Sequence, residues 1–187
     1  MVDSKALDRY VRAARPRYEA ELRRWVELPT ISLMAESRPS IQRCAEAAAS
    51  AVTALGGTAE VLKTRGNPVV VGRFGNDRKH PTVTIYNHLD VQPAEGAAWK
   101  REAFKLSIEG DRYYARGATD DKGPALSVLY AAAFARQADV PLNIQFVWEL
   151  EEEIGSPNFD GFMQKHAKAL RTDVVVVSDT VWLAPGK

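Results

Sequence analysis

The amino-terminal part of the chain repeats apolar residues with the period of a helix. Over residues 4–28 they recur every three or four positions, at Leu7, Tyr10, Val11, Ala14, Tyr18, Leu22 and Trp25. Pro16 is expected to kink or split this helix, because proline cannot donate the helical hydrogen bond. A second helix is predicted to begin with Ser40 as its N-cap and to end at Gly56–Gly57. Its apolar face consists of Ile41, Cys44, Ala48, Val52 and Leu55.

Beyond this helix the pattern changes to short runs rich in β-branched residues, which predict strands. The predicted elements, in chain order, are strands at 58–64, 67–75 and 82–88, a hairpin over 104–116 that turns at 109–111, a helix at 122–137, a strand at 142–150, a helix at 157–170 and a strand at 174–179. Strands that alternate with helices predict an α/β layered fold with a mostly parallel central sheet flanked by helices. The four valines at 174–177 are apolar on both faces, as expected of a central parallel strand.

Composition and charge narrow the possible functions. The chain has 187 residues and is 45% hydrophobic, which is enough for a substantial core. Its 25 basic and 24 acidic side chains give a net charge of +1, so nothing favours a nucleic acid or a membrane as partner. The single Cys44 excludes an internal disulfide and is interpreted as a small core residue. No signal peptide or membrane span is visible, and a soluble, cytoplasmic protein is expected.

Polar residues that suit a metal site follow three of the predicted strands and precede the predicted helix at 122–137. They form four clusters along the chain, at His88–Asp90, Asp120–Asp121, Glu149–Glu153 and Asp179. In open α/β sheets, ligands collect at the carboxyl ends of the strands, so these clusters are expected to meet at one edge. One imidazole with several carboxylates is a mixed nitrogen and oxygen ligand set for a divalent metal, with zinc as the default.

Each of these clusters also has a simpler interpretation. Residues His88 and Asp90 lie on the same side of a strand, where the carboxylate can orient a metal-binding imidazole, but they could equally form a surface pair. Glu152 and Glu153 could divide the roles of general base and metal ligand, or they could belong to a solvated acidic turn. The residues alone leave both choices open.

Four motifs in order carry a resemblance to a known family. They are HLDVQPAEG from His88, ARGATDDKGP from Ala115, ELEEEIGSP from Glu149 and VVVVSDTVWLAPGK from Val174. Together they resemble the di-metal peptidase family that includes carnosinase, carboxypeptidase G and acetylornithine deacetylase, and most closely its dipeptidase branch. The resemblance implies a zinc-aminopeptidase-like catalytic domain that cleaves dipeptides or small peptides with a metal-activated water. It also implies two divalent metal ions, zinc first and manganese or cobalt as alternatives.

The resemblance assigns a role to individual residues of this sequence. The matched positions are His88 as a metal ligand, Asp90 as its orienting partner, Asp120 as the bridging metal ligand, Glu152 as the general base, and Glu153 and Asp179 as further metal ligands. The peptide bond between Asp120 and Asp121 is expected to be cis. Glu149 and Glu151 receive no metal role and are expected to make structural or solvent contacts.

The resemblance also places this chain within a larger protein. Residues 1–187 match the amino-terminal portion of the catalytic domain, and the lid or dimerisation domain and the carboxyl-terminal catalytic segment are not among them. The last histidine ligand of the family is therefore missing, because His80 and His166 are expected on the surface. The full-length form is expected to be a homodimer that acts on a dipeptide or small amide. Two alternatives are an N-acyl amino acid deacylase with the same centre and an inactive fragment that binds metal incompletely, with apolar surface after Trp182 favouring self-association.

Overall fold

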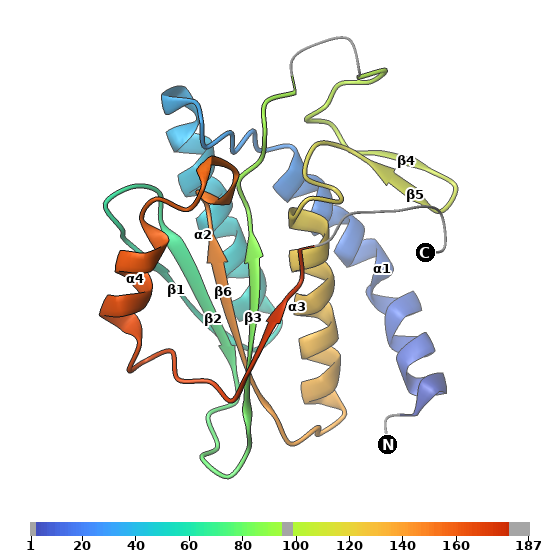
Figure 1. The fold of residues 1–187 in the computed structure, drawn as a ribbon. Coiled ribbons are helices and arrows are strands. Elements are labelled where there is room, and N and C mark those ends of the chain that lie inside the picture. Colours follow the sequence, from blue (N-terminus) through green and yellow to red (C-terminus); the bar gives the residue numbers. More distant parts are fainter. Residues whose placement is uncertain (1–2, 95–98, 180–187) are drawn as a thin grey trace.

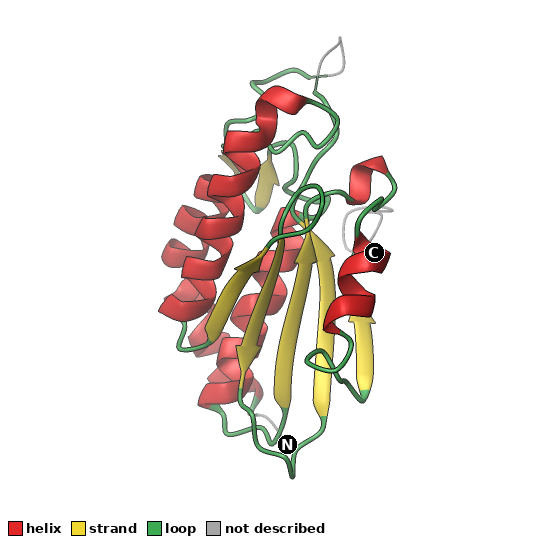
Figure 2. Ribbon diagram, turned by 90° about the vertical axis from the view of Figure 1, so that its left-hand side faces the viewer, coloured by secondary structure: helices red, strands yellow, loops and turns green. Residues whose placement is uncertain are grey.

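The computed structural model describes residues 3–94 and 99–179, which form an α/β layered fold (Figures 1 and 2). The five-stranded sheet has the order β1-β2-β6-β3-β7. Its strands are β1 Thr58–Leu62, β2 Val69–Phe74, β3 Thr82–His88, β6 Asn143–Glu149 and β7 Val174–Val177. Three helices, α1 Ser4–Val26, α2 Arg38–Ala54 and α3 Lys122–Gln137, lie on one face, and the short α4 Phe159–His166 lies on the other.

The sheet is mixed. Strands β1, β2 and β6 pair antiparallel, whereas β6, β3 and β7 pair parallel. The predicted α/β architecture is therefore confirmed, with parallel pairing confined to three strands. These three run in the same direction in Figure 1 and end at the same edge of the sheet. In the parallel register His88 lies opposite Glu149, so the polar residues that follow β3 and β6 start side by side.

The two ends of the second helix show how local chemistry sets a boundary. α2 begins at Arg38, so Ser40 lies in the first turn and the prediction that it is the N-cap was wrong. Pro39 explains the earlier start, because a first-turn residue needs no amide hydrogen for the helical ladder. At the other end Gly56 has a φ of 87°, a conformation that glycine adopts without strain.

Other predicted elements are present with changed limits. α1 continues through Pro16, so the expected split is not there. The predicted hairpin is formed by β4 Ser107–Glu109 and β5 Arg112–Tyr114, with Gly110 at a φ of 61° in its turn. α4 ends at His166, four residues before the predicted end. Two further 3₁₀ turns are η1 Ala35–Ser37 and η2 Glu152–Ile154.

The prediction of a central position for the four valines was wrong for the described part of the chain. β7 pairs with β3 on one side only and is the edge strand, and its valines are 42–61% exposed. Apolar character on both faces shows that a strand suits burial, but it does not supply the neighbours that bury it. The surface expected after Trp182 lies outside the described residues.

The main core lies between the sheet and the three helices on one face. Trp25 of α1 meets Trp148 of β6 edge to face with ring centroids 5.8 Å apart, and both are fully buried. Cys44 is also fully buried there, as predicted for a core residue. A smaller cluster under α4 joins Val69, Val71, Val147, Phe162 and Leu170. Within the described ranges, no helix is both long and apolar enough to span a membrane.

Candidate metal centre

Three potential metal ligands converge at the carboxyl edge of the parallel strands. His88 ends β3, Asp120 precedes α3, and Asp179 follows β7. One ligand atom from each lies within 4.8 Å of the other two. Nε2 of His88 is 2.9 Å from Oδ1 of Asp120 and 3.8 Å from Oδ2 of Asp179. The structure thus brings together residues that are up to 91 positions apart in the sequence, as the strand-end argument predicted.

The orientation of the imidazole suits metal binding. Nδ1 of His88 donates a hydrogen bond to the backbone carbonyl of Asp90 at 3.1 Å. A carbonyl oxygen can only accept, so Nδ1 carries a proton, and Nε2 is the nitrogen left to bind a metal once it releases its own proton. Nε2 is the atom that faces Asp120 and Asp179. The ring is 1% exposed, which fixes this orientation.

The electrostatics of the cluster favour a cation. Burial lowers the pKa of His88, but the hydrogen bond and charge of Asp90, together with Asp121 and Asp120, outweigh it and raise the pKa to about 10. The surrounding carboxylates therefore stabilise positive charge at the position where a metal would bind. One imidazole nitrogen and two carboxylate oxygens at this spacing match the ligand types of zinc sites.

Asp90 supports more than the histidine. Its carboxylate is fully buried, and Oδ1 lies 3.5 Å from Nδ1 of His88. The same carboxylate accepts hydrogen bonds from the backbone amides of Glu152 at 3.2 Å and Glu153 at 3.1 Å. Asp90 thus fixes the start of the η2 turn relative to His88. Sequence reasoning assigned only the first of these roles, because no local signal links Asp90 to amides 62 and 63 residues away.

The adjacent glutamates of η2 lie in different surroundings. Oε2 of Glu152 is 3.9 Å from Nε2 of His88, so Glu152 borders the cluster, and burial raises the pKa of its carboxyl. The carboxylate of Glu153 instead accepts hydrogen bonds from the backbone amide of Gln92 at 3.2 Å and from its side-chain amide at 2.8 Å. Glu153 is not part of the converging group of three, and its role as a metal ligand stays a prediction.

The other two glutamates of the acidic stretch make structural contacts, as expected. Glu149 is buried and accepts hydrogen bonds from the hydroxyls of Tyr86 at 2.6 Å and Ser156 at 2.9 Å. Glu151 accepts a hydrogen bond from the backbone amide of Asn67 at 2.8 Å. The acidic stretch therefore combines two carboxylates that make structural contacts with one, Glu152, that borders the site and one, Glu153, that Gln92 engages.

The peptide bond between Asp120 and Asp121 is cis, as the resemblance implied. The two carboxylates point to different partners. Asp120 contacts the imidazole of His88, whereas Asp121 accepts hydrogen bonds from the side-chain amide of Asn87 at 2.8 Å and from the backbone amide of His88 at 3.2 Å. Burial raises the pKa of Asp121 to about 7. Asp121 therefore anchors the loop to the end of β3.

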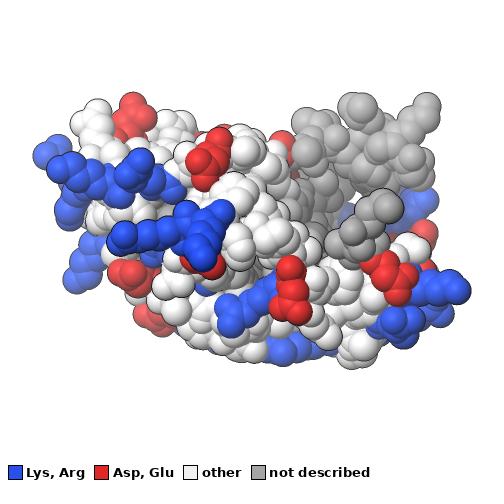
Figure 3. Space-filling model, turned by 90° about the horizontal axis from the view of Figure 1, so that it is seen from below, with Lys and Arg blue, Asp and Glu red and all other residues white. Residues whose placement is uncertain are grey.

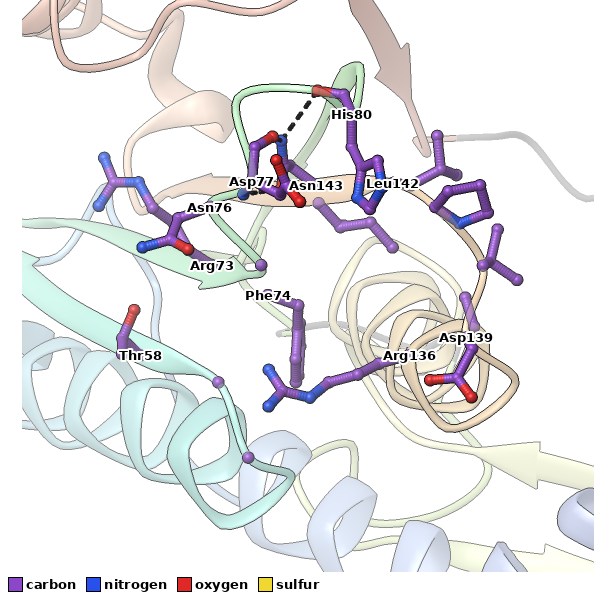
Figure 4. Close-up of a pocket in the computed structure, with 17 residues that line it drawn as sticks. Thr58, Arg73, Phe74, Asn76, Asp77, His80, Arg136, Asp139, Leu142 and Asn143 are labelled. Atoms are coloured by element: carbon purple, nitrogen blue, oxygen red, sulfur yellow. Dashed lines mark hydrogen bonds between the residues drawn. The ribbon is translucent and has the colours of Figure 1, made fainter.

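The opposite end of the sheet carries a separate cavity of about 760 Å³ (Figure 4). It lies between the turn after α2, the loop after β2 and the loop before β6, and its lining includes Phe74, His80 and Arg136. None of the predicted site residues lines it. Among the described residues seen from this end, acidic side chains lie beside and between groups of basic ones (Figure 3). The predicted site residues thus lie away from this cavity.

Residues 84–186 match the family described as Peptidase family M20/M25/M40. The chain belongs to this peptidase family. Among curated members, it is 33% identical to the Cys-Gly metallodipeptidase dug1 of Schizosaccharomyces pombe, an alignment that covers 91% of this chain and 39% of that protein. It is 37% identical to the Beta-Ala-His dipeptidase of Rattus norvegicus over 64% of this chain and 25% of that protein.

The solved structures of two dipeptidases agree with this assignment. The dipeptidase Dug1p of Saccharomyces cerevisiae superposes with a TM-score of 0.87 at 29% identity, covering 96% of this chain and 41% of that one. Human carnosine dipeptidase 1 superposes with a TM-score of 0.85 at 29% identity, covering 94% and 41%. The chain therefore spans about two fifths of the length of these relatives, and the fold of that part agrees with the predicted catalytic domain.

Proposed function

We propose that the full-length protein is a metal-dependent dipeptidase. Full-length here means the complete polypeptide that the organism makes. The observation that carries this proposal is the convergence of His88, Asp120 and Asp179 at the sheet edge with Glu152 beside them. The M20 family is metal-dependent, and the relatives reported above are dipeptidases. The donor set on this chain fits that cofactor, because it supplies one imidazole nitrogen and two carboxylate oxygens.

Two divalent ions, with zinc first and manganese or cobalt as alternatives, are proposed as the cofactors. His88, Asp120 and Asp179 are proposed to hold one ion, with Asp120 shared and Glu153 a ligand of the second. When bound, such ions polarise the scissile carbonyl and lower the pKa of a water toward ~7. Asp120 and Asp179 retain 53% and 31% exposure of their side chains, so a substrate can approach this side of the cluster.

Glu152 is proposed as the general base. Its side chain is 38% exposed and borders the cluster, so it can reach both a water and a substrate. Glu152 takes a proton from the water while the water oxygen bonds to the scissile carbonyl carbon. It then gives the proton to the departing amine as the carbon–nitrogen bond breaks, which returns Glu152 to its starting state. A raised pKa favours the first of these steps, because the carboxylate accepts the proton more readily.

The proposed substrates are dipeptides or similar small amides. Relatives at 33–37% identity carry the names Cys-Gly metallodipeptidase and Beta-Ala-His dipeptidase, which favours this class over the N-acyl amino acid deacylase alternative. Dipeptide hydrolysis and N-acyl amino acid deacylation need the same metal centre. The choice between the two substrate classes therefore depends on the part of the pocket that recognises the substrate amine. It stays a prediction that the full-length protein is a homodimer. It also stays a prediction that its partners include neither a nucleic acid nor a membrane.

A substrate panel on the full-length protein tests this function. The protein is loaded with zinc, manganese or cobalt and assayed with Cys-Gly, β-Ala-His and other dipeptides beside the matching N-acetyl amino acids. We expect dipeptide hydrolysis that a chelator abolishes and added metal restores. Hydrolysis of the N-acetyl series alone would favour the deacylase. A protein that binds two metals per chain and cleaves neither series would overturn the proposal.

A further inference from the structure

Three consecutive residues before and at the start of α3 reach in three directions. Asp120 is half-exposed and contacts the imidazole of His88, and Asp121 is buried against the end of β3. Lys122 is fully buried and extends away from the metal centre toward the end of α1. The position of the half-exposed ligand Asp120 is therefore set largely by the two buried residues that follow it.

Lys122 binds backbone carbonyls. Its ammonium donates hydrogen bonds to the carbonyls of Trp25 at 3.0 Å and Leu28 at 2.8 Å. No carboxylate of the described residues lies within 4.0 Å of this ammonium. Trp25 belongs to the last turn of α1, where the helix dipole is negative, and its carbonyl also accepts a hydrogen bond from the backbone amide of Leu28 at 3.2 Å. A buried cation is well placed there without an ion-pair partner.

The segment that Lys122 holds also contacts the other ligand loop. This segment, Leu28–Ile31, is called the LPTI segment below after its sequence. The hydroxyl of Thr30 donates a hydrogen bond to the carbonyl of Leu89 at 2.7 Å, and the backbone amide of Val91 donates to the carbonyl of Thr30 at 3.0 Å. Leu89 and Val91 flank Asp90, which orients His88 and the η2 turn. Thr30 is fully buried, as are both of its partners.

We propose that Lys122 and Thr30 are positioning residues that join the two ligand loops through the LPTI segment. This inference rests on the proposed function for the identity of the ligands. Lys122 ties the loop of Asp120 to one side of the segment, and Thr30 ties the loop of His88 and Asp90 to the other. Metal ligands must be held within about 0.5 Å of their productive geometry. Loss of either tie is expected to let the loops separate and to weaken the site without removing a ligand.

The test compares Lys122→Met and Thr30→Val with Leu129→Ala in the full-length protein. Methionine keeps the length of the lysine stem and removes its ammonium, and valine keeps the shape of threonine and removes its hydroxyl. Leu129 is a fully buried core residue of the same α3 helix and makes none of these ties, so it controls for general loss of stability. Cobalt affinity is measured by visible absorption, and thermal unfolding is recorded in parallel. Hydrogen exchange of the backbone amides is followed without metal in the two ligand loops, at residues 88–91 and 117–121.

Each tie is expected to be worth ~10–100-fold in cobalt affinity, the range found for groups that orient metal ligands. Amide exchange in both loops is expected to rise in the Lys122→Met and Thr30→Val proteins and to stay unchanged in the Leu129→Ala protein. The double variant is expected to lose less than the product of the single losses, because both ties act through the same segment. If Lys122→Met does not fold, Thr30→Val carries the test.

Several outcomes would overturn the inference. One is a cobalt affinity equal to that of the wild type in both the Lys122→Met and the Thr30→Val protein. Another is an equal loss of cobalt affinity in a Leu129→Ala protein whose thermal stability equals theirs. Cobalt binding that His88→Ala leaves unchanged would overturn it as well, because the metal would then lie elsewhere. Its failure is separable from that of the proposed function: a wild-type protein that cleaves no dipeptide, but whose cobalt affinity depends on Lys122 and Thr30, refutes the dipeptidase and supports the ties.

Discussion

Strands β6 and β7 are both parallel neighbours of β3, and each ends beside the candidate metal centre. Every residue of β6 is buried between β2 and β3, whereas all four valines of β7 are exposed on the edge of the described sheet. The turn after β6 is held by Asp90 and by the hydrogen bonds of Glu149 and Glu151. Asp179 follows a strand that is paired on one side only. The centre therefore has one well-supported side and one side with little support.

The largest expected effect concerns the 187-residue chain by itself. On its described part, His88, Asp120 and Asp179 offer three ligands to one metal. The proposed second metal would have only Asp120 and Glu153, which are too few to hold it. We expect about one weakly bound metal per chain and no measurable dipeptide turnover. Metal counting after dialysis and a dipeptide assay, with the full-length protein as control, check this. Two metals per chain with robust turnover would contradict it. A neighbouring copy of the chain that supplies a histidine ligand would produce that result.

The next largest effect is expected from substitutions of the two adjacent glutamates that follow β6. Glu152→Gln removes the proposed base and leaves the metal ligands, so the turnover number of the full-length protein should fall ~10²–10⁴-fold with metal content unchanged. Glu153→Gln is the matched variant. Because it alters a proposed metal ligand, its main effect should be a lower metal affinity. Steady-state kinetics and metal analysis on both proteins separate the roles. Metal loss in the Glu152→Gln protein would show that the assignment is wrong.

A smaller loss is expected when the support of the β6 side is altered. Asp90→Asn keeps the shape of the side chain but replaces one carboxylate oxygen by an amide nitrogen, which donates and cannot accept. Only one of the backbone amides of Glu152 and Glu153 therefore keeps its acceptor. Metal affinity of the full-length protein, measured by competition with a chelator, should fall ~10–100-fold. Asp139→Asn is the control, since this exposed residue has a φ of 50° that both side chains tolerate. Equal affinity in the two variants would contradict the role of Asp90.

Much of the site could be predicted because its residues follow apolar runs directly. β3 ends at His88 and β6 ends at Glu149, so the strand pattern alone places both at the carboxyl edge. The tie from Asp90 to the η2 turn could not be predicted, because it depends on how two distant loops meet. The buried ammonium of Lys122 was missed for the same reason, since its partners lie 94 and 97 residues away.

The two adjacent glutamates show a different limit of sequence reasoning. Both are acids in the same turn, and composition cannot distinguish a base from a ligand. In the 3₁₀ turn that begins at Glu152, neighbouring side chains point about 120° apart, so only one of the two borders His88. The second carboxylate is engaged by Gln92. Which of them binds metal is decided by the backbone path and not by residue type.

The smallest expected effect compares the two strands through the same substitution. Val147 of β6 is 2% exposed and Val176 of β7 is 42% exposed. Val147→Thr buries a hydroxyl and should lower the free energy of unfolding of the 187-residue chain by about 1–3 kcal/mol. Val176→Thr should change it by about 0.5 kcal/mol or less, because the hydroxyl stays in water. Urea unfolding followed by circular dichroism measures both values.

The same pair of variants in the full-length protein sharpens the comparison. If further polypeptide covers β7 there, the cost of Val176→Thr should rise toward that of Val147→Thr, whereas the cost at Val147 should stay the same. Equal costs at the two positions in the 187-residue chain would contradict the exposed edge that the structure gives to β7. A cost at Val176 that appears only in the full-length protein would show that the support for Asp179 comes from residues beyond these 187.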